Sequence, residues 1–426
     1  MRARTIITLL AIGTLGCGKQ IELPVGEPLR AGIDTSLDEQ DMLSYLVAGK
    51  PVTVYGEVRA YYAARFEAAG LALPDSATLV HLSPGKFREA YQALASHAAP
   101  EGLRGFTVRE ARTAKIVLPT DLTLAAHRLT FAHEVGHAYA AQRGGNRGEL
   151  PAELVNIGVA LAELARYPEL SLADAGRILR APAADAAQLD EYHLAVLASL
   201  ELLAAEQMDL GQALERALDS EDELIQATRE AAAAHPQGPP GLFLDRIAAL
   251  TRCDGLAGPL AASLGPDLAG EVLDYLELGA TTEALQARVA ARWQGPEQGR
   301  AEQMAALGRQ GVELNRGYPS ERFPEVRRAH VYTWYAATWA ETQRLDDAAA
   351  LELAEEFIAT FGQRFGQGGY LDRIAPEMLY LAAYAAAGLG QRCQASRYLE
   401  WMVTQYPNTS GAAELAEAAE RMADSC

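Results

Sequence analysis

The stretch LTFAHEVGHA, residues 129–138, decides how the chain is organised, because its spacing is meaningful only on an α-helix. His133 and His137 are four residues apart, so on a helix both imidazoles lie on one face and can bind one metal ion. Glu134 lies about 100° round the helix from His133, close to that ion without being its ligand. This is the position of a general base that takes a proton from a water held by zinc. The segment therefore predicts Zn2+ as the cofactor.

The opposite face of the same helix is apolar. Leu124, Phe131, Val135 and Ala138 fall in a narrow arc across from His133. A helix with such an arc packs it on a core and presents its other side to a site. We therefore predict a buried helix over residues 121–143.

Two histidines leave a third protein ligand to be found, since catalytic zinc sites have three. Pro151 opens a second predicted helix, over 151–166, and Glu149, Glu153 and Glu163 are available near it. Glu153 lies in the first turn on an apolar stripe, where a carboxylate is costly unless it is paired or bound to metal. Glu163 points toward a more exposed flank. We therefore predict Glu153 as the third ligand, with Glu149 in the preceding loop as the alternative. A helix N-terminal charge, favoured by the helix dipole, would also explain Glu153.

Residues 128–137, Arg-Leu-Thr-Phe-Ala-His-Glu-Val-Gly-His, resemble the Arg-x-Thr-x-Ala-His-Glu-x-Gly-His stretch of the ImmA/IrrE-type peptidases, a compact group of gluzincins. The resemblance also includes the strand at 115–118 before the helix, and it does not extend beyond this part of the chain. It implies a zincin-like metallopeptidase domain, made of a short sheet and the active-site helix. By the same resemblance His133 and His137 are zinc ligands, Glu134 is the catalytic base, and Glu153 matches the glutamate that opens the next helix.

The surrounding pattern predicts a fold that is mainly α with a small α+β part. Strands are expected at 77–82, 105–109 and 115–118, and helices at 54–71 and 84–97. We expect strand 115–118 to be the edge along which an extended substrate pairs. Candidates for stabilising the oxyanion are Tyr139, Tyr192 and His193, which spacing does not rank. The other histidines, including His81 and His127, have no partner at ligand spacing, and we interpret them as structural.

The clearest linker is HPQGPPG at residues 235–241, which predicts a domain boundary between a zincin-like domain at 51–235 and an all-helical domain at 242–426. The last predicted hairpin, 379–407, resembles a tetratricopeptide repeat, with Gly390 at its turn and Pro407 at its end. A generic helical bundle is the alternative. In either case the helices would offer a surface to a protein partner.

The N-terminus predicts an exported lipoprotein. Arg2 and Arg4 precede an apolar stretch that is too short to span a bilayer, as in a signal peptide of residues 1–16. The stretch ends in Thr-Leu-Gly-Cys, which resembles a bacterial lipobox and predicts lipidation of Cys17, followed by a tether over 17–50. An ordinary secretory signal with an incidental cysteine is the alternative. The expected location is the bacterial cell envelope, periplasmic or on the outer membrane, with the lipid as the only membrane anchor.

The net charge limits the classes of partner, and the cysteines suggest one disulfide. The formal net charge of −19 would repel phosphate backbones, so nucleic-acid binding is not expected. Cys393 and Cys426 lie at adjacent ends of the last predicted helices and would suit a disulfide in an exported protein, which leaves Cys253 free.

Together these features predict an exported zinc metallopeptidase that hydrolyses peptide bonds in a peptide or protein substrate. The alternative is an envelope scaffold that binds protein partners through its helices and has a non-catalytic zinc site. An intact Glu134 favours the peptidase, because a structural ion needs ligands and not a base.

Overall fold

The structure is a computed structural model. It describes residues 9–10, 23–30, 49–110, 113–143, 148–164, 179, 181–182, 186–317, 324–367 and 371–424. The chain divides into two compact units, the first made of residues 1–179, 189–236 and 245–277, the second of 180–188, 237–244 and 278–426. It is mainly helical with one small sheet, which confirms the predicted fold class. Within the described ranges, no helix combines the length and apolarity that crossing a membrane requires.

The sheet lies in the first unit and consists of β1 (Leu9–Leu10), β2 (Glu27–Pro28), β3 (Ala77–Leu82), β4 (Phe106–Glu110) and β5 (Thr113–Pro119). The strand order is β1-β4-β5-β3-β2. β5 pairs in parallel with β3 and antiparallel with β4. The prediction that strand 115–118 forms a free edge is therefore wrong, because both of its sides are already paired. Among the described residues, the outer side of β4 pairs with the two residues of β1 alone.

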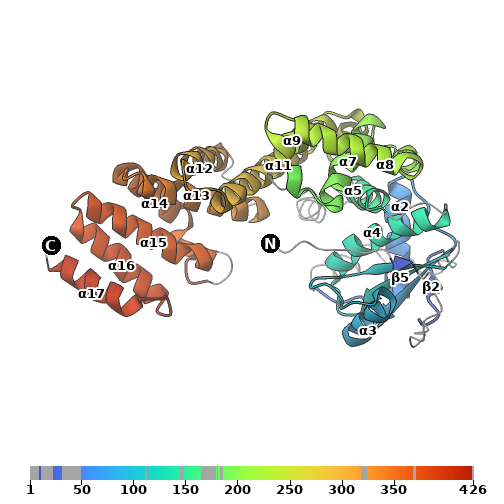
Figure 1. The fold of residues 1–426 in the computed structure, drawn as a ribbon, viewed down its shortest axis with the longest axis horizontal. Helices are drawn as coiled ribbons and strands as arrows, with labels where there is room; N and C mark the ends of the chain where they lie inside the picture. The colour runs from blue at the N-terminus through green and yellow to red at the C-terminus, as the bar shows by residue number, and fades with distance from the viewer. Residues whose placement is uncertain are drawn as a thin grey trace. The chain divides into compact units, whose positions relative to one another are not determined.

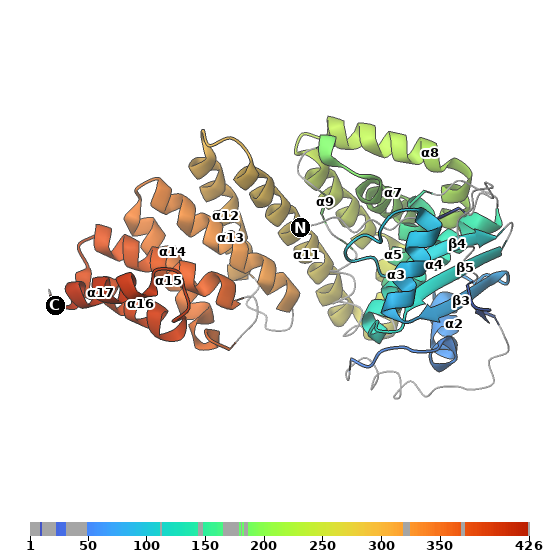
Figure 2. The same cartoon turned by 60° about the horizontal axis from the view of Figure 1, so that its bottom comes forward.

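Helices cover both faces of this sheet (Figures 1 and 2). α3 (Pro84–Ala95) packs on one face, and α4 (Leu124–Gln142) packs on the other. Successive side chains of a strand point to opposite faces of the sheet, so β4 contacts both helices. Phe106 and Val108 join the core under α3, whereas Thr107 between them bonds to α4. β4 therefore connects the sheet directly to the helix that carries the histidines.

α5 (Leu150–Leu164) is the most buried helix near the site. Each of its residues except Ala162 is buried. It packs against α2 (Arg59–Ala68), α4, α7 (Glu191–Ala205) and α8 (Leu210–Ala234). A helix that is apolar on all sides is one surrounded by other elements, so the few carboxylates on α5 need partners inside the protein.

The predicted linker at 235–241 leads directly into a helix. The next helices are α9 (Gly238–Thr251), α10 (Asp254–Leu264) and α11 (Pro266–Gln294). Pro239 and Pro240 fall in the first turn of α9, where a missing N–H breaks no helical hydrogen bond. Residues 245–277 belong to the first unit, beyond the boundary that the sequence predicts.

The second unit is a series of helices: α12 (Arg300–Gly317), α13 (Pro324–Gln343), α14 (Asp347–Phe361), α15 (Leu371–Gly388), α16 (Arg392–Gln405) and α17 (Ala412–Ala423). Consecutive helices pack against each other, and α13 also packs against α15. Trp334, Phe357 and Phe361 form edge-on and tilted ring contacts in its core. Gly390 has φ +76°, a conformation that favours glycine, in the turn between α15 and α16. The tetratricopeptide character stays a prediction.

Several predicted features lie outside the described residues: Cys17, Cys426 and, apart from short pieces, the predicted signal peptide and tether. Cys393 is disulfide-bonded, and its pairing with Cys426 stays a prediction. Cys253 is free and buried, and its thiol donates to the Gln207 side chain at 3.3 Å.

A pair of histidines, His127 and the half-buried His81, joins α4 to the sheet and to α2. His127 is fully buried, with its Nδ1 2.7 Å from the Tyr62 hydroxyl and its Nε2 2.8 Å from the His81 Nε2. Burial lowers the pKa of His127 well below its ordinary value, and His81 lowers it further. Burial also lowers the pKa of His81, against the opposing effect of Glu27 and Glu57. Both rings are therefore neutral in the fold at neutral pH.

Acidification should destabilise the first unit through this pair. Because both pKa values are lowered by folding, the unfolded chain binds the protons more tightly, and stability is lost as the pH falls below about 6.5. Each proton that the unfolded chain binds and the folded chain does not changes the free energy of unfolding by up to about 1.4 kcal/mol per pH unit. Urea unfolding between about pH 7.5 and about pH 5.5 measures the effect. His127→Phe should be less stable at the higher pH yet less sensitive to acid than the native chain, with His97→Phe at an exposed position as control. Equal pH slopes for native and His127→Phe would contradict the prediction.

Candidate metal centre

α4 carries both histidines and approaches α5 closely at Gly136. A Cβ on Gly136 would lie 2.5 Å from the Ala152 Cα and from the Pro151 carbonyl oxygen, so only glycine fits there. The predicted apolar arc is buried, with Phe131 and Val135 at 0% exposure. The face with His133 and His137 is buried as well, under the start of α5. The candidate site therefore lies between two packed helices.

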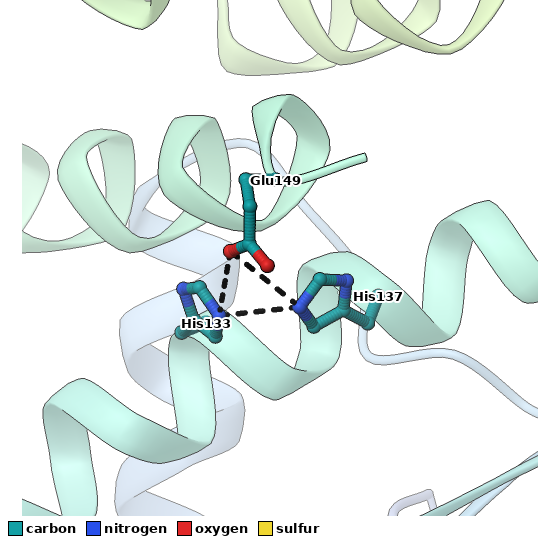
Figure 3. Close-up of side chains that lie close together, drawn as sticks. All are labelled: His133, His137 and Glu149. Carbon is teal, nitrogen blue, oxygen red and sulfur yellow. Dashed lines mark hydrogen bonds and ion pairs between the residues drawn. The ribbon is translucent and has the colours of Figure 1, made fainter. Parts of the chain in front are cut away.

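Three ligand atoms converge at this place (Figure 3). The Nε2 atoms of His133 and His137 are 3.2 Å apart. The Glu149 Oε2 lies 3.4 Å from the first and 4.0 Å from the second. Two nitrogens bound to one zinc ion at about 2.0–2.1 Å in tetrahedral geometry lie about 3.3 Å apart. The three atoms thus form a slightly widened face of a coordination tetrahedron, and this buried group could hold a metal ion.

Glu153 lies on the other side of the same imidazole. Its Oε1 is 2.6 Å from the His133 Nδ1, and its side chain is 1% exposed. The Glu153 N–H donates to the Glu149 carbonyl at 2.9 Å, so the two residues are one helical turn apart. Glu149 faces the converging nitrogens and Glu153 holds the ring from behind, so the geometry favours the alternative, Glu149, over the predicted third ligand, Glu153. The helical pattern puts both carboxylates on one face, and only the packing register of α4 on α5 separates their roles.

Burial and charge make this site suited to a cation. Burial raises the pKa of Glu149 to about 8, with His133 opposing and the neighbouring carboxylates adding to the rise. Burial lowers the pKa of His137 well below its ordinary value. Burial alone would lower the pKa of His133 too, but Glu153 raises it to about 9. Within the described part of the chain the Glu149 Oε2 has no hydrogen-bond partner, and a divalent cation would satisfy this atom and offset the buried negative charge.

Glu134 is fully buried beside the ligands and is held by β4. The Thr107 hydroxyl donates to its Oε2 at 2.7 Å. Its Oε1 has no hydrogen-bond partner among the described residues. Burial raises the pKa of Glu134, while His133 and the Thr107 hydrogen bond lower it. One oxygen is thus held by a hydrogen bond, and the other has none from the described residues.

The remaining candidates bond to other groups. Glu163 is 2% exposed, not on an exposed flank, and its carboxylate pairs with Arg65 at 2.7 Å and with Arg128 at 3.2 Å. This network ties α2, α4 and α5 together, so Arg128, the first residue of the 128–137 segment, is structural. The Tyr139 hydroxyl donates to the Ala72 carbonyl and is not placed at the ligands. His193 is bonded through Nδ1 to Asp190 at 2.6 Å, at the start of α7.

The two carboxylates should differ in their effect on metal binding. Glu149→Gln removes a ligand and should weaken zinc binding the most. Glu153→Gln removes only the partner that orients His133, and loss of such partners typically weakens metal affinity about 10–100-fold. Competition with a chromogenic chelator measures both constants, with Glu89→Gln on the exposed face of α3 as control. A larger loss in Glu153→Gln would restore Glu153 as the ligand.

Comparisons with known proteins assign no function to this site. No protein-family model matches the chain, and neither the curated proteins nor the solved structures contain a match. The resemblance to the ImmA/IrrE-type peptidases thus depends on the sequence of residues 128–137 and its immediate surroundings alone. Any function for this chain has to be argued from the chemistry of His133, His137, Glu149 and Glu134.

Proposed function

We propose that this chain is a zinc-dependent peptidase. The observation that carries the proposal is the convergence of His133, His137 and Glu149, with ligand atoms 3.2–4.0 Å apart, next to the buried carboxylate of Glu134. Two imidazoles and one carboxylate are a common protein ligand set for catalytic zinc, which keeps a further position open. Nitrogen and oxygen donors at these separations suit zinc better than the larger, oxygen-bound calcium.

Each side chain then has one task. A bound zinc ion would supply Lewis acidity, which lowers the pKa of a water and polarises a substrate carbonyl. Glu134 takes a proton from the attacking water at Oε1 and passes it to the leaving amine. Thr107 holds the Oε2 of Glu134 at 2.7 Å, which keeps Oε1 turned to the reaction. Glu153 fixes His133 through Nδ1, so that Nε2 points to the metal.

The substrate would pair with β4 instead of β5. β4 carries Thr107, whose side chain touches Glu134, and its outer side pairs with only two of the described residues, Leu9 and Leu10. An extended peptide that adds to this edge gains main-chain hydrogen bonds and lies beside the general base. The position of the cleaved bond would then be set by strand pairing.

The location and partners in this proposal come from the sequence. Cleavage before Cys17 and its lipidation would tether the enzyme to the bacterial cell envelope, with no other contact with the membrane. The helices of the second unit, in a tetratricopeptide-like arrangement, would bind a protein partner or present substrate.

The alternative is a scaffold lipoprotein with a non-catalytic zinc site. Tyr380 and Tyr384, one turn apart on α15, are 42% and 48% exposed and favour a binding surface on the second unit. A structural zinc site, however, gains nothing from a buried Glu134 to which the described residues bond at only one oxygen. Such a group costs stability, so the peptidase is the better explanation of the site.

Replacing the general base distinguishes the peptidase from the scaffold. Glu134→Gln keeps the shape of the side chain but cannot take a proton, so zinc should stay bound while cleavage falls by about 10²–10⁴-fold. The measurements are metal content by mass spectrometry and cleavage of casein and a peptide library by the full chain. Glu89→Gln, on the opposite side of the sheet, should cleave like the native protein. A native chain that retains zinc and cleaves none of these substrates would favour the scaffold.

A further inference from the structure

The short segment that carries Glu149 is held from α8. Glu149 directly precedes α5, and the first N–H groups of a helix have no partner within it. The Leu150 N–H donates to the Glu221 Oε1 at 3.1 Å. The Gly148 N–H donates to the same carboxylate. Glu221 therefore binds the peptide groups on both sides of the residue whose oxygen faces the two imidazoles.

Two local features allow this contact. α8 is kinked in the middle, where Ser220 leaves helical geometry with φ −137° and ψ 29°, directly before Glu221. On the other side of the contact, a Cβ on Gly148 would overlap the Glu221 carboxylate. The kink brings Glu221 closer to the segment of Glu149 than a regular helix would. The missing side chain of Gly148 lets that segment approach the Glu221 carboxylate. Capping of α5 alone would need neither, since a serine or aspartate before the helix serves that purpose.

We propose that Glu221 is a positioning residue for the metal centre, which holds Glu149 in its ligating orientation by fixing the backbone before and after it. The inference rests on the proposed function, because it explains what holds Glu149, the third ligand of the proposed zinc site, in place. Glu149 is the only one of the three ligands outside a helix, and only its carbonyl, which accepts the Glu153 N–H, joins the hydrogen bonds of α5. A carboxylate from a separate helix supplies the missing restraint.

The test measures metal affinity and stability separately in the full chain. Glu221→Ala should weaken zinc binding about 10–100-fold, the usual cost of losing a partner outside the ligand shell. Gly148→Ala should do the same from the other side of the contact by displacing the carboxylate. Glu221→Gln keeps a hydrogen-bond acceptor and should recover much of the affinity. The constants come from chelator competition, and the cobalt(II) form provides a visible spectrum that loses intensity when a ligand leaves tetrahedral coordination.

Glu191→Gln is the matched control, since Glu191 on α7 acts on both Glu149 and Glu221 through its charge and is itself exposed. If this variant weakens zinc binding as much as Glu221→Ala, charge alone is responsible and the proposal fails. It fails too if Glu221→Ala lowers the thermal midpoint of the metal-free protein but leaves zinc affinity unchanged, as a plain helix cap would. A native chain that binds no zinc would instead overturn the proposed function, and this inference with it.

Discussion

The close packing of α4 on α5 at Gly136 is the constraint on which the candidate site depends. Any side chain larger than hydrogen would meet the backbone of α5 at Pro151 and Ala152. Because the helices touch there, the start of α5 is brought over the turn that carries His133 and His137. A wider separation would leave Glu149 unable to reach the two nitrogens, which already lie 3.4 and 4.0 Å from its oxygen.

Such close packing buries polar groups, and α5 accommodates them by pairing each carboxylate with α4. Glu153 faces His133, and Glu163 faces Arg128 together with Arg65 from α2. A buried charge without a partner costs several kcal/mol, so these contacts strongly disfavour a shift of one helix along the other. The register that positions the ligands is therefore fixed by ion pairs as well as by shape.

Much of this first unit could be predicted from sequence, because its signals are local. The strand at 77–82 and the helix that carries His133 follow from side-chain period, and both are present as β3 and α4. The sequence favours Glu153 over Glu149, whereas Glu149 lies nearer the Nε2 atoms. The two residues are one helical turn apart and share a face, and the tertiary register of α4 on α5, which has no local signal, decides which of them meets Nε2. The His81–His127 pair was missed for a similar reason: 46 residues separate them, and only the sheet brings them together.

The arrangement around Glu134 is the strongest support for the proposed peptidase. A metal site that only stabilises the fold would be served equally well by an apolar residue at this position, which would avoid the cost of a buried carboxylate. Here the carboxylate is kept, one oxygen is fixed by Thr107, and the other is left without a partner in the described part of the chain. Fixing one oxygen lowers the freedom of the group without occupying the oxygen that would receive a proton. The cost in stability is then explained by the pre-organisation that general base catalysis requires.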